Sequence, residues 1–113
     1  MLEYRFEKKT VTGVLEYLIN VKPPYEMLFD LSSGFLQTCD GVIEVLEGLQ
    51  KVQAGETEIY TFGGSDYCIV DAGKEKAIIE YDFGESRAEI ATSEIVKLLT
   101  DWKAYLAREG KCG

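Results

Sequence analysis

The stretch ETEIYTFGGSDYCIVDAGKEKAIIEYDFGESRAEIA, residues 56–91, decides the fold of this chain. Apolar side chains gather there in four short runs, and glycine lies between each run and the next. Glycine permits the positive φ angles that tight hairpin turns require. The stretch therefore predicts an antiparallel meander of four strands, at Thr57–Phe62, Asp66–Asp71, Lys76–Phe83 and Arg87–Ala91.

Two helical patterns flank this meander in the sequence. Residues 38–53 and residues 93–108 both carry apolar side chains at three- and four-residue spacing, and the second stripe includes Trp102. The expected N-caps are Thr38 or Asp40 for the first helix and Thr92 or Ser93 for the second. We expect both amphipathic helices to pack on one face of a mostly antiparallel sheet, which makes residues 1–113 a single α+β domain.

The first third of the chain gives weaker patterns. Residues 2–8 alternate between apolar and charged side chains, which predicts a strand with one buried face. Residues 12–21 suit a short helix that ends before the Pro23-Pro24 pair, although a strand competes with this interpretation. Residues 25–31 predict a further short strand.

The composition describes an acidic globular chain. Its 113 residues fit one domain and include 20 acidic and 12 basic side chains and no histidine, for a net charge of −8. Nucleic-acid binding needs clustered Lys and Arg, so this balance argues against it, and equally against docking on an anionic membrane. The lack of histidine removes the commonest general base and a frequent metal ligand.

Cysteine usage and the start of the chain bear on its compartment. Cys39, Cys68 and Cys112 are odd in number and widely spaced, whereas a disulfide framework or a zinc site favours closely paired cysteines. We therefore expect Cys39 and Cys68 to be reduced core residues and Cys112 to be exposed.

The N-terminal residues lack an apolar signal segment, and no apolar run approaches the roughly 20 residues of a membrane span. These observations predict a cytoplasmic protein.

The negative charge is concentrated in the predicted meander. Residues 56–91 hold nine acidic and three basic side chains, a balance of −6 within the chain's −8. Residues 10–55 contribute −4, and residues 1–9 and 92–113 contribute +1 each. The sheet is therefore the most acidic part of the predicted fold.

One face of the predicted sheet combines apolar, aromatic and acidic side chains. Strand alternation places Ile79, Tyr81 and Phe83 beneath the helices and leaves the other face outward. The outward face and its adjoining turns then contain the candidate binding residues Tyr67, Ile69, Ile78, Glu80, Asp82, Glu85 and Glu89. Such a mixture is typical of protein-binding surfaces. The alternatives are an ordinary solvated sheet face, or a face whose isoleucines are covered by residues 10–37.

No catalytic motif is evident in the sequence. The glycine-rich segment at residues 63–66 lacks both the lysine and the following helix of a phosphate-binding loop. A nucleophilic cysteine or serine usually needs a nearby histidine as its general base, and the sequence has none. The carboxylates of Glu80 and Asp82 remain as a means of hydrolysis or Mg²⁺ binding, but two carboxylates alone make a weak site. We expect a non-catalytic domain without metal or cofactor.

Three segments of the second half carry a family resemblance: KAIIEYDFG at residues 76–84, AEIATSEIV at 88–96 and LTDWKAYL at 99–106. Together they resemble the C-terminal half of small immunity proteins of bacterial polymorphic toxin and contact-dependent inhibition systems. Because such proteins differ in fold, no binding residue is transferred from them. The resemblance implies an immunity protein that neutralises a cognate basic toxin, such as a nuclease, whose active site must be positive to hold phosphates.

Two other functions stay open. A small assembly protein would form a homo-oligomer through the outer sheet face or Cys112. A nucleic-acid mimic would block a DNA- or RNA-binding protein through carboxylates spaced along an extended surface. In this chain Ile, Tyr and Lys side chains interrupt the acidic residues, which favours a mixed protein interface. The expected partner is a basic protein, without direct nucleic-acid or membrane binding.

Overall fold

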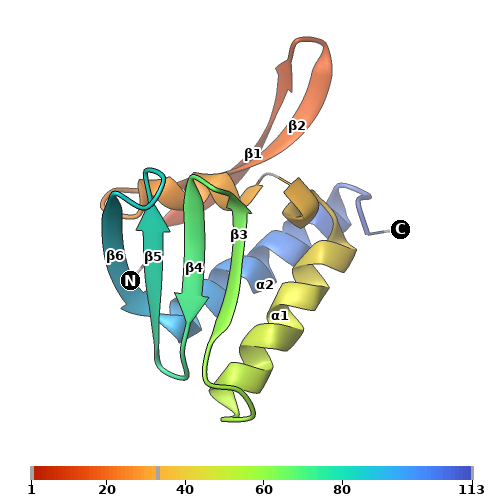
Figure 1. Ribbon diagram of the computed structural model, residues 1–113. Helices are drawn as coiled ribbons and strands as arrows, with labels where there is room; N and C mark the ends of the chain where they lie inside the picture. Colours follow the sequence, from red (N-terminus) through yellow and green to blue (C-terminus); the bar gives the residue numbers. More distant parts are fainter. Residues whose placement is uncertain (1, 33, 113) are drawn as a thin grey trace.

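The computed structural model describes residues 2–32 and 34–112 (Figure 1). This part of the chain contains two antiparallel sheets and several helices in a mixed α+β arrangement, as predicted. In chain order the elements are β1 (Tyr4–Val11), β2 (Val14–Val21), the 3₁₀ helices η1 (Glu26–Ser32) and η2 (Gly34–Gln37), α1 (Cys39–Gln53), β3 (Tyr60–Ser65), β4 (Cys68–Ala72), β5 (Lys76–Tyr81), β6 (Ser86–Ala91) and α2 (Thr92–Arg108).

Strands β3 to β6 form the predicted meander, in which each strand pairs antiparallel with the next. The first connection differs from the prediction, because Gly63 and Gly64 lie inside β3 rather than in the turn. The pairing register shifts between Gly63 and Ser65, and a side chain on Gly63 would collide with the carbonyl oxygen of Cys68. Glycine therefore allows an irregular strand end that lies very close to its neighbour.

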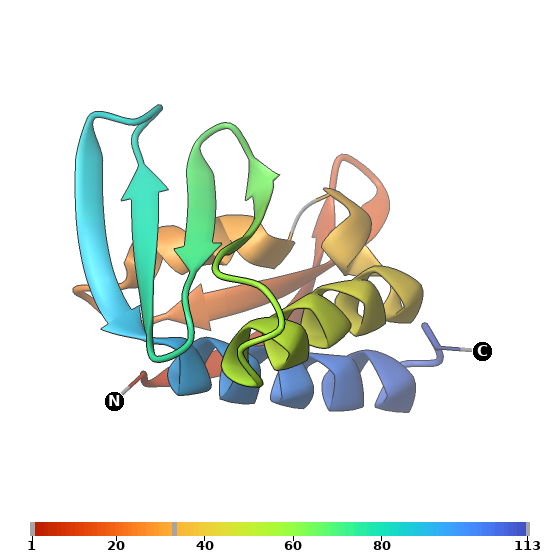
Figure 2. The same cartoon turned by 60° about the horizontal axis from the view of Figure 1, so that its bottom comes forward.

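The core lies between the inner face of this sheet and the helices (Figure 2). α1 contacts β3, α2 contacts β6 and the two helices contact each other, so both predicted helices pack on one face of the sheet, as expected. η1 adds to the same side through contacts with β3 and β4. The inner-face side chains of Val70 and Ile79 are completely buried as a result.

The two main helices begin in different ways. The Thr38 side chain accepts a hydrogen bond from the backbone N–H of Gly41 at 3.2 Å and caps α1, as predicted. Helix α2 has no side-chain cap, so the expectation for Thr92 or Ser93 is wrong. The buried Thr92 hydroxyl instead donates to the carbonyl oxygen of Gly73 at 2.7 Å, which ties α2 to the β4–β5 turn.

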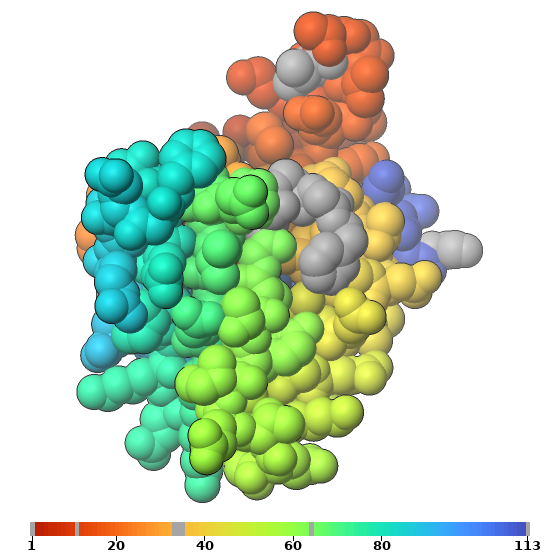
Figure 3. Space-filling model, viewed as in Figure 1, coloured from red at the N-terminus to blue at the C-terminus, as the bar shows by residue number. Residues whose placement is uncertain are grey.

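β1 and β2 form a separate hairpin that projects from the body of the molecule (Figures 1 and 3). The helix predicted over residues 12–21 is therefore wrong, and the competing strand is correct. Thr12 and Gly13 adopt positive φ angles of 48° and 82°, which build a two-residue hairpin turn. Further along β2, Ile19 and Val21 alternate inward and are buried in the core.

The short strand predicted over residues 25–31 is also wrong. This segment forms η1, and its Met27, Leu28 and Leu31 are buried. A spacing of three residues places Leu28 and Leu31 on one side of a 3₁₀ helix, whereas a strand would turn them to opposite faces. Packing against β2 and β3 therefore selects the 3₁₀ helix.

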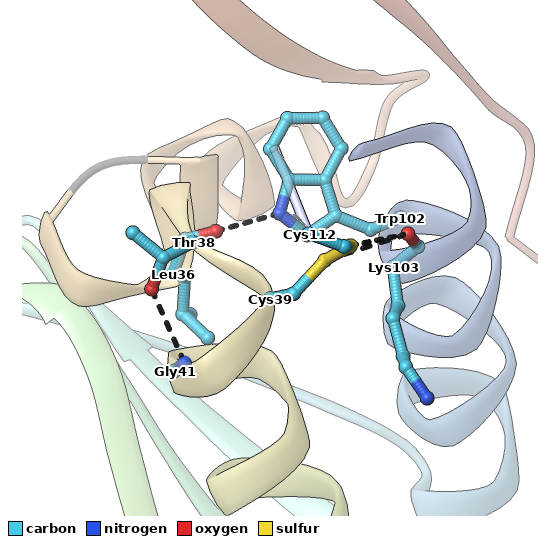
Figure 4. Close-up of a disulfide and its surroundings, with 7 residues drawn as sticks. All are labelled: Leu36, Thr38, Cys39, Gly41, Trp102, Lys103 and Cys112. Atoms are coloured by element: carbon cyan, nitrogen blue, oxygen red, sulfur yellow. Dashed lines mark hydrogen bonds between the residues drawn. A yellow bond between two sulfur atoms is a disulfide. The ribbon is translucent and has the colours of Figure 1, made fainter. Parts of the chain in front are cut away.

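A disulfide bond joins Cys39 to Cys112, whose Cα atoms are 5.1 Å apart (Figure 4). The expectation of a reduced Cys39 is therefore wrong, while Cys68 is a free buried thiol and Cys112 is exposed, as predicted. The prediction from the wide sequence spacing was wrong because α1 and α2 pack side by side and run antiparallel (Figure 1). This packing brings the first residue of α1 beside the segment that follows α2.

Candidate functional site

The outer face of the β3–β6 sheet is open over the described residues (Figures 1 and 2). η1 and α2 lie behind the sheet in Figure 1, and α1 lies beside β3. The described part of residues 10–37 therefore does not cover Ile69 and Ile78, and that alternative is wrong. Both isoleucines are only partly buried, by their neighbours within the sheet.

Four of the seven predicted binding residues lie on this open face. Ile69 on β4 is paired with Glu80 on β5, and Ile78 on β5 is paired with Glu89 on β6. The Glu89 carboxylate lies 3.6 Å from the ammonium group of Lys76, which balances part of its charge. Apolar and acidic side chains thus face each other in these two pairs, while Glu80 also faces the basic Arg87 on β6.

The other three predicted residues lie at one end of the sheet. Tyr67 is in the β3–β4 turn, and Asp82 and Glu85 are in the β5–β6 turn. In Figure 1 both turns are at the end of the sheet where η1 passes behind it. The predicted set therefore divides into a face group and an end group that adjoin each other.

Strand β5 ends two residues earlier than predicted. Asp82 and Phe83 both adopt a left-handed φ of 56°, so the strand stops at Tyr81 and a turn follows. Asp82 consequently does not continue the strand face on which Glu80 lies. The two carboxylates are not the same-face pair that was considered for Mg²⁺ binding.

The structure adds two aromatic residues to the end group, Phe29 and Phe83. The rings of Phe29, Tyr67 and Phe83 form a row, with 5.9 Å between the centroids in each of its two contacts. Phe29 is 50% exposed and Phe83 is 73% exposed, so the prediction of an inward Phe83 is wrong. Asp82 and Gly84 are turn-forming residues and were the signal for an outward Phe83. No comparable signal marks Phe29, because its position depends on η1.

A shallow hollow of about 440 Å³ lies beside this row, and it is lined by Asp66, Ile69, Glu80, Phe83 and Gly84. Its lining therefore combines an aromatic ring and an isoleucine with two carboxylates. We call the row and the hollow together, with the acidic turn beside them, the acidic aromatic surface. Its members are Phe29, Asp66, Tyr67, Ile69, Glu80, Asp82, Phe83 and Glu85.

The backbone beneath Phe83 is strained. A left-handed conformation costs a bulky residue such as Phe83 roughly 1–2 kcal/mol, whereas the short polar side chain of Asp82 tolerates the same φ. Gly84 follows with a φ of 88°, where glycine carries no such cost. Strain of this kind gathers at functional sites, and here its effect is to direct a large apolar ring toward solvent.

The free thiol of Cys68 is buried beneath the sheet. Burial, followed by the charge of Asp30, raises the pKa of the Cys68 thiol to about 12, so this thiol stays neutral and is a poor nucleophile.

Among residues 2–32 and 34–112, no three His, Cys, Asp or Glu side chains are grouped to hold a metal ion. No helix in the same ranges is long and apolar enough to cross a membrane.

A larger recess of about 740 Å³ lies elsewhere, at the base of the β1–β2 hairpin beside α2. Its lining mixes charges of both signs, including Arg5, Lys97 and Asp101. The Tyr4 hydroxyl donates a hydrogen bond to Asp101, and burial together with this bond raises the pKa of Tyr4. Two of the recess's polar groups are therefore already bonded to each other, and the recess is separate from the acidic aromatic surface.

Comparison with protein-family models, with curated proteins and with solved structures gave no match to this chain. The resemblance to immunity proteins therefore gains no support from a relative.

Proposed function

We propose that this chain is a non-catalytic protein-binding domain, and specifically an immunity protein that neutralises a basic toxin domain. The observation that carries the proposal is the aromatic row Phe29–Tyr67–Phe83, whose two outer rings are exposed and which is bordered by carboxylates beside the open face of the sheet. Aromatic residues that are exposed in the free protein and bordered by polar groups are typical anchors of protein interfaces.

The charge of the surface defines the partner. The surface contains four carboxylates, on Asp66, Glu80, Asp82 and Glu85, within a chain of net charge −8. Such a surface attracts a basic partner and speeds its association, while it repels acidic proteins and nucleic acid. A toxin domain that acts on nucleic acid must itself be basic where it binds phosphate. A nuclease domain is therefore the partner that fits this surface best.

The proposal requires a gene for a toxin domain beside the gene for this chain, and the test uses that domain. Cells that produce this toxin domain should grow only when the chain is produced with it. The two purified proteins should form a heterodimer whose association rate falls steeply as salt is added. If the wild-type chain neither binds the toxin domain nor restores growth, the proposed function is wrong.

A pair of charge reversals tests the surface separately from the function. We expect Glu80→Lys together with Asp82→Lys to weaken binding about 100-fold or more, because two attractive contacts become repulsive. Circular dichroism should remain that of a folded chain, and the free energy of unfolding should fall by at most about 1 kcal/mol, because position 80 faces Arg87 on β6. The matched control is Glu44→Lys with Glu47→Lys, which makes the same charge change on exposed positions of α1. Full binding by the folded Glu80/Asp82 variant would exclude this surface as the binding site.

A further inference from the structure

The β1–β2 hairpin carries a feature that the proposed function does not use, an open strand edge. Its two strands form a sheet of their own, with no third strand among the described residues. The distal part, from Lys8 to Glu16, is exposed and stands away from the body in Figures 1 and 3, apart from the side chain of Val11, which is not described. Val14 and Leu15 near its tip are 60% and 50% exposed. A two-stranded ribbon without further packing is only marginally stable in water.

The backbone pattern shows which edge is open. The two-residue turn makes Val11 and Val14 a hydrogen-bonded pair, and such pairs alternate along a hairpin. The peptide groups of Phe6, Lys8 and Thr10 on β1 therefore point away from β2. On the other edge, the side chain of Gln37 already donates to the outward carbonyl oxygen of Tyr17 on β2, at 2.9 Å, and η1 packs against β2. The edge left for pairing is that of β1.

The side chains along this edge form a self-complementary row. Glu3, Arg5, Glu7 and Lys9 alternate in sign and, by strand alternation, point to the same face. When a second copy runs antiparallel with Phe6 opposite its own counterpart, Glu3 faces Lys9 and Arg5 faces Glu7, each twice. Sliding one strand by two residues would place like charges opposite each other. The row therefore favours one register.

Lysines on a strand edge often serve to prevent pairing, and β1 carries two of them, Lys8 and Lys9. Lys8 is already engaged within its own chain, because its ammonium group lies 2.8 Å from the Glu109 carboxylate. Lys9 is the member of the row that would face Glu3 of the second copy. The charges on this edge are thus either neutralised internally or complementary across a two-fold axis.

We propose that β1 pairs antiparallel with β1 of a second copy, which forms a continuous four-stranded sheet in the order β2-β1-β1-β2. The contact is isologous, so it closes as a dimer and does not extend into a fibre. It also gives the distal half of each hairpin a neighbour, since Lys8, Lys9 and Thr10 lie opposite residues 2–4 of the other copy. The inference is independent of the proposed function, because the acidic aromatic surface lies on a different sheet.

This dimer is tested by sedimentation velocity and light scattering over a series of protein concentrations that extends into the upper micromolar range. We expect the mass to rise from 12.7 kDa toward twice that value, and the amides of Phe6, Lys8 and Thr10 to become protected from hydrogen exchange as the mass rises. Arg5→Glu should raise the dissociation constant about tenfold or more, because it places carboxylates opposite each other. Adding Glu7→Arg to that variant should restore the dimer by exchanging the charges.

The control is Lys51→Glu, which makes the same charge change on an exposed position of α1 and should leave the dimer intact. A wild-type chain that stays monomeric throughout the series overturns the proposal. A dimer that persists in the Arg5→Glu variant, or that the double variant does not restore, overturns the assignment to β1. Each of these outcomes leaves the toxin-binding test unaffected.

Discussion

Trp102 joins three parts of the molecule at one buried point (Figure 4). Its side chain is completely buried, and its indole Nε1 donates to the carbonyl oxygen of Leu36 at 2.8 Å. The centroid of its ring lies 5.2 Å from that of Phe6 and 5.7 Å from that of Tyr105. We predict that Trp102→Ala lowers the free energy of unfolding by about 3–5 kcal/mol, because it leaves a large cavity. Urea denaturation followed by circular dichroism measures this loss.

A second variant separates the hydrogen bond of Trp102 from its packing. Trp102→Phe keeps an aromatic ring but leaves the buried carbonyl of Leu36 without its donor, at a cost of about 1–3 kcal/mol. It should therefore be more stable than Trp102→Ala and less stable than the wild type. A loss below about 1 kcal/mol for Trp102→Ala would contradict the buried position of this side chain.

The Cys68 thiol makes stability depend on alkaline pH. Burial raises its pKa from 9.0 to about 12, so the folded chain keeps a proton that the unfolded chain loses above about pH 9. The stabilisation that this proton provides is present below pH 9 and is lost as the pH rises toward 12. We predict that raising the pH from about 8 to about 10.5 lowers the free energy of unfolding of Cys68→Ala by less than it lowers that of the wild type. Urea denaturation at both values tests this, and parallel losses would contradict it.

At the scale of elements, the sequence predicted the parts whose signals are local and periodic. α1, α2 and the meander follow from apolar spacing and from glycine between strands, and their centres were correctly placed. The two segments whose structure was predicted wrongly are residues 12–21 and 25–31. The spacing of their apolar side chains fits both a helix and a strand. Their form depends on contacts with distant elements: β2 pairs with β1, and η1 packs against β2 and β3.

The candidate site shows the same division. The face group followed from strand alternation, which is why Ile69 and Glu80 could be placed from the sequence. Phe83 could not, because extending the strand past Tyr81 reverses the side to which it points. Phe29 reaches the site from η1, more than thirty residues away in the chain from Tyr67. The spacing of apolar residues along the chain does not indicate contacts between segments so far apart.

The β5–β6 turn links stability to the proposed binding. Phe83→Gly removes the left-handed strain at this position, and the exposed ring contributes little packing beyond its contact with Tyr67. We predict that the variant is more stable than the wild type, by up to about 1 kcal/mol, and that it binds the toxin domain more weakly. Thermal unfolding and a binding titration measure the two effects. A less stable variant would show that the ring packs more than its exposure indicates.

At the scale of the whole molecule, the chain divides its charge between two separate surfaces. The meander holds a balance of −6 and presents the acidic aromatic surface, whereas β1 carries alternating charges along a free edge. A dimer formed through the hairpins would leave the acidic aromatic surface of each copy uncovered by the hairpin contact. Such a dimer therefore has two acidic aromatic surfaces, one for each of two toxin domains.

The disulfide bond acts on the fold as a whole. It joins Cys39 to Cys112 across 73 residues, so the closed loop contains α1, the entire meander and α2, while the hairpin lies outside it. Closing so long a loop restricts the unfolded chain. We predict that reduction lowers the free energy of unfolding by about 2–4 kcal/mol, as measured by urea denaturation with and without a reductant. Cys112→Ser is the control, and its stability should not respond to the reductant.

The same bond tests the cytoplasmic location predicted from the sequence. Disulfide bonds form in oxidising compartments and are rare in a reducing cytoplasm. Cells are denatured in an excess of alkylating reagent, so that the buried Cys68 thiol also reacts, and mass spectrometry then counts the free thiols of the chain. One modified cysteine, Cys68, means that the disulfide is present in the cell and that the chain folds in an oxidising compartment. Three modified cysteines mean that the cytoplasmic chain folds without the bond, and its stability there is then that of the reduced form.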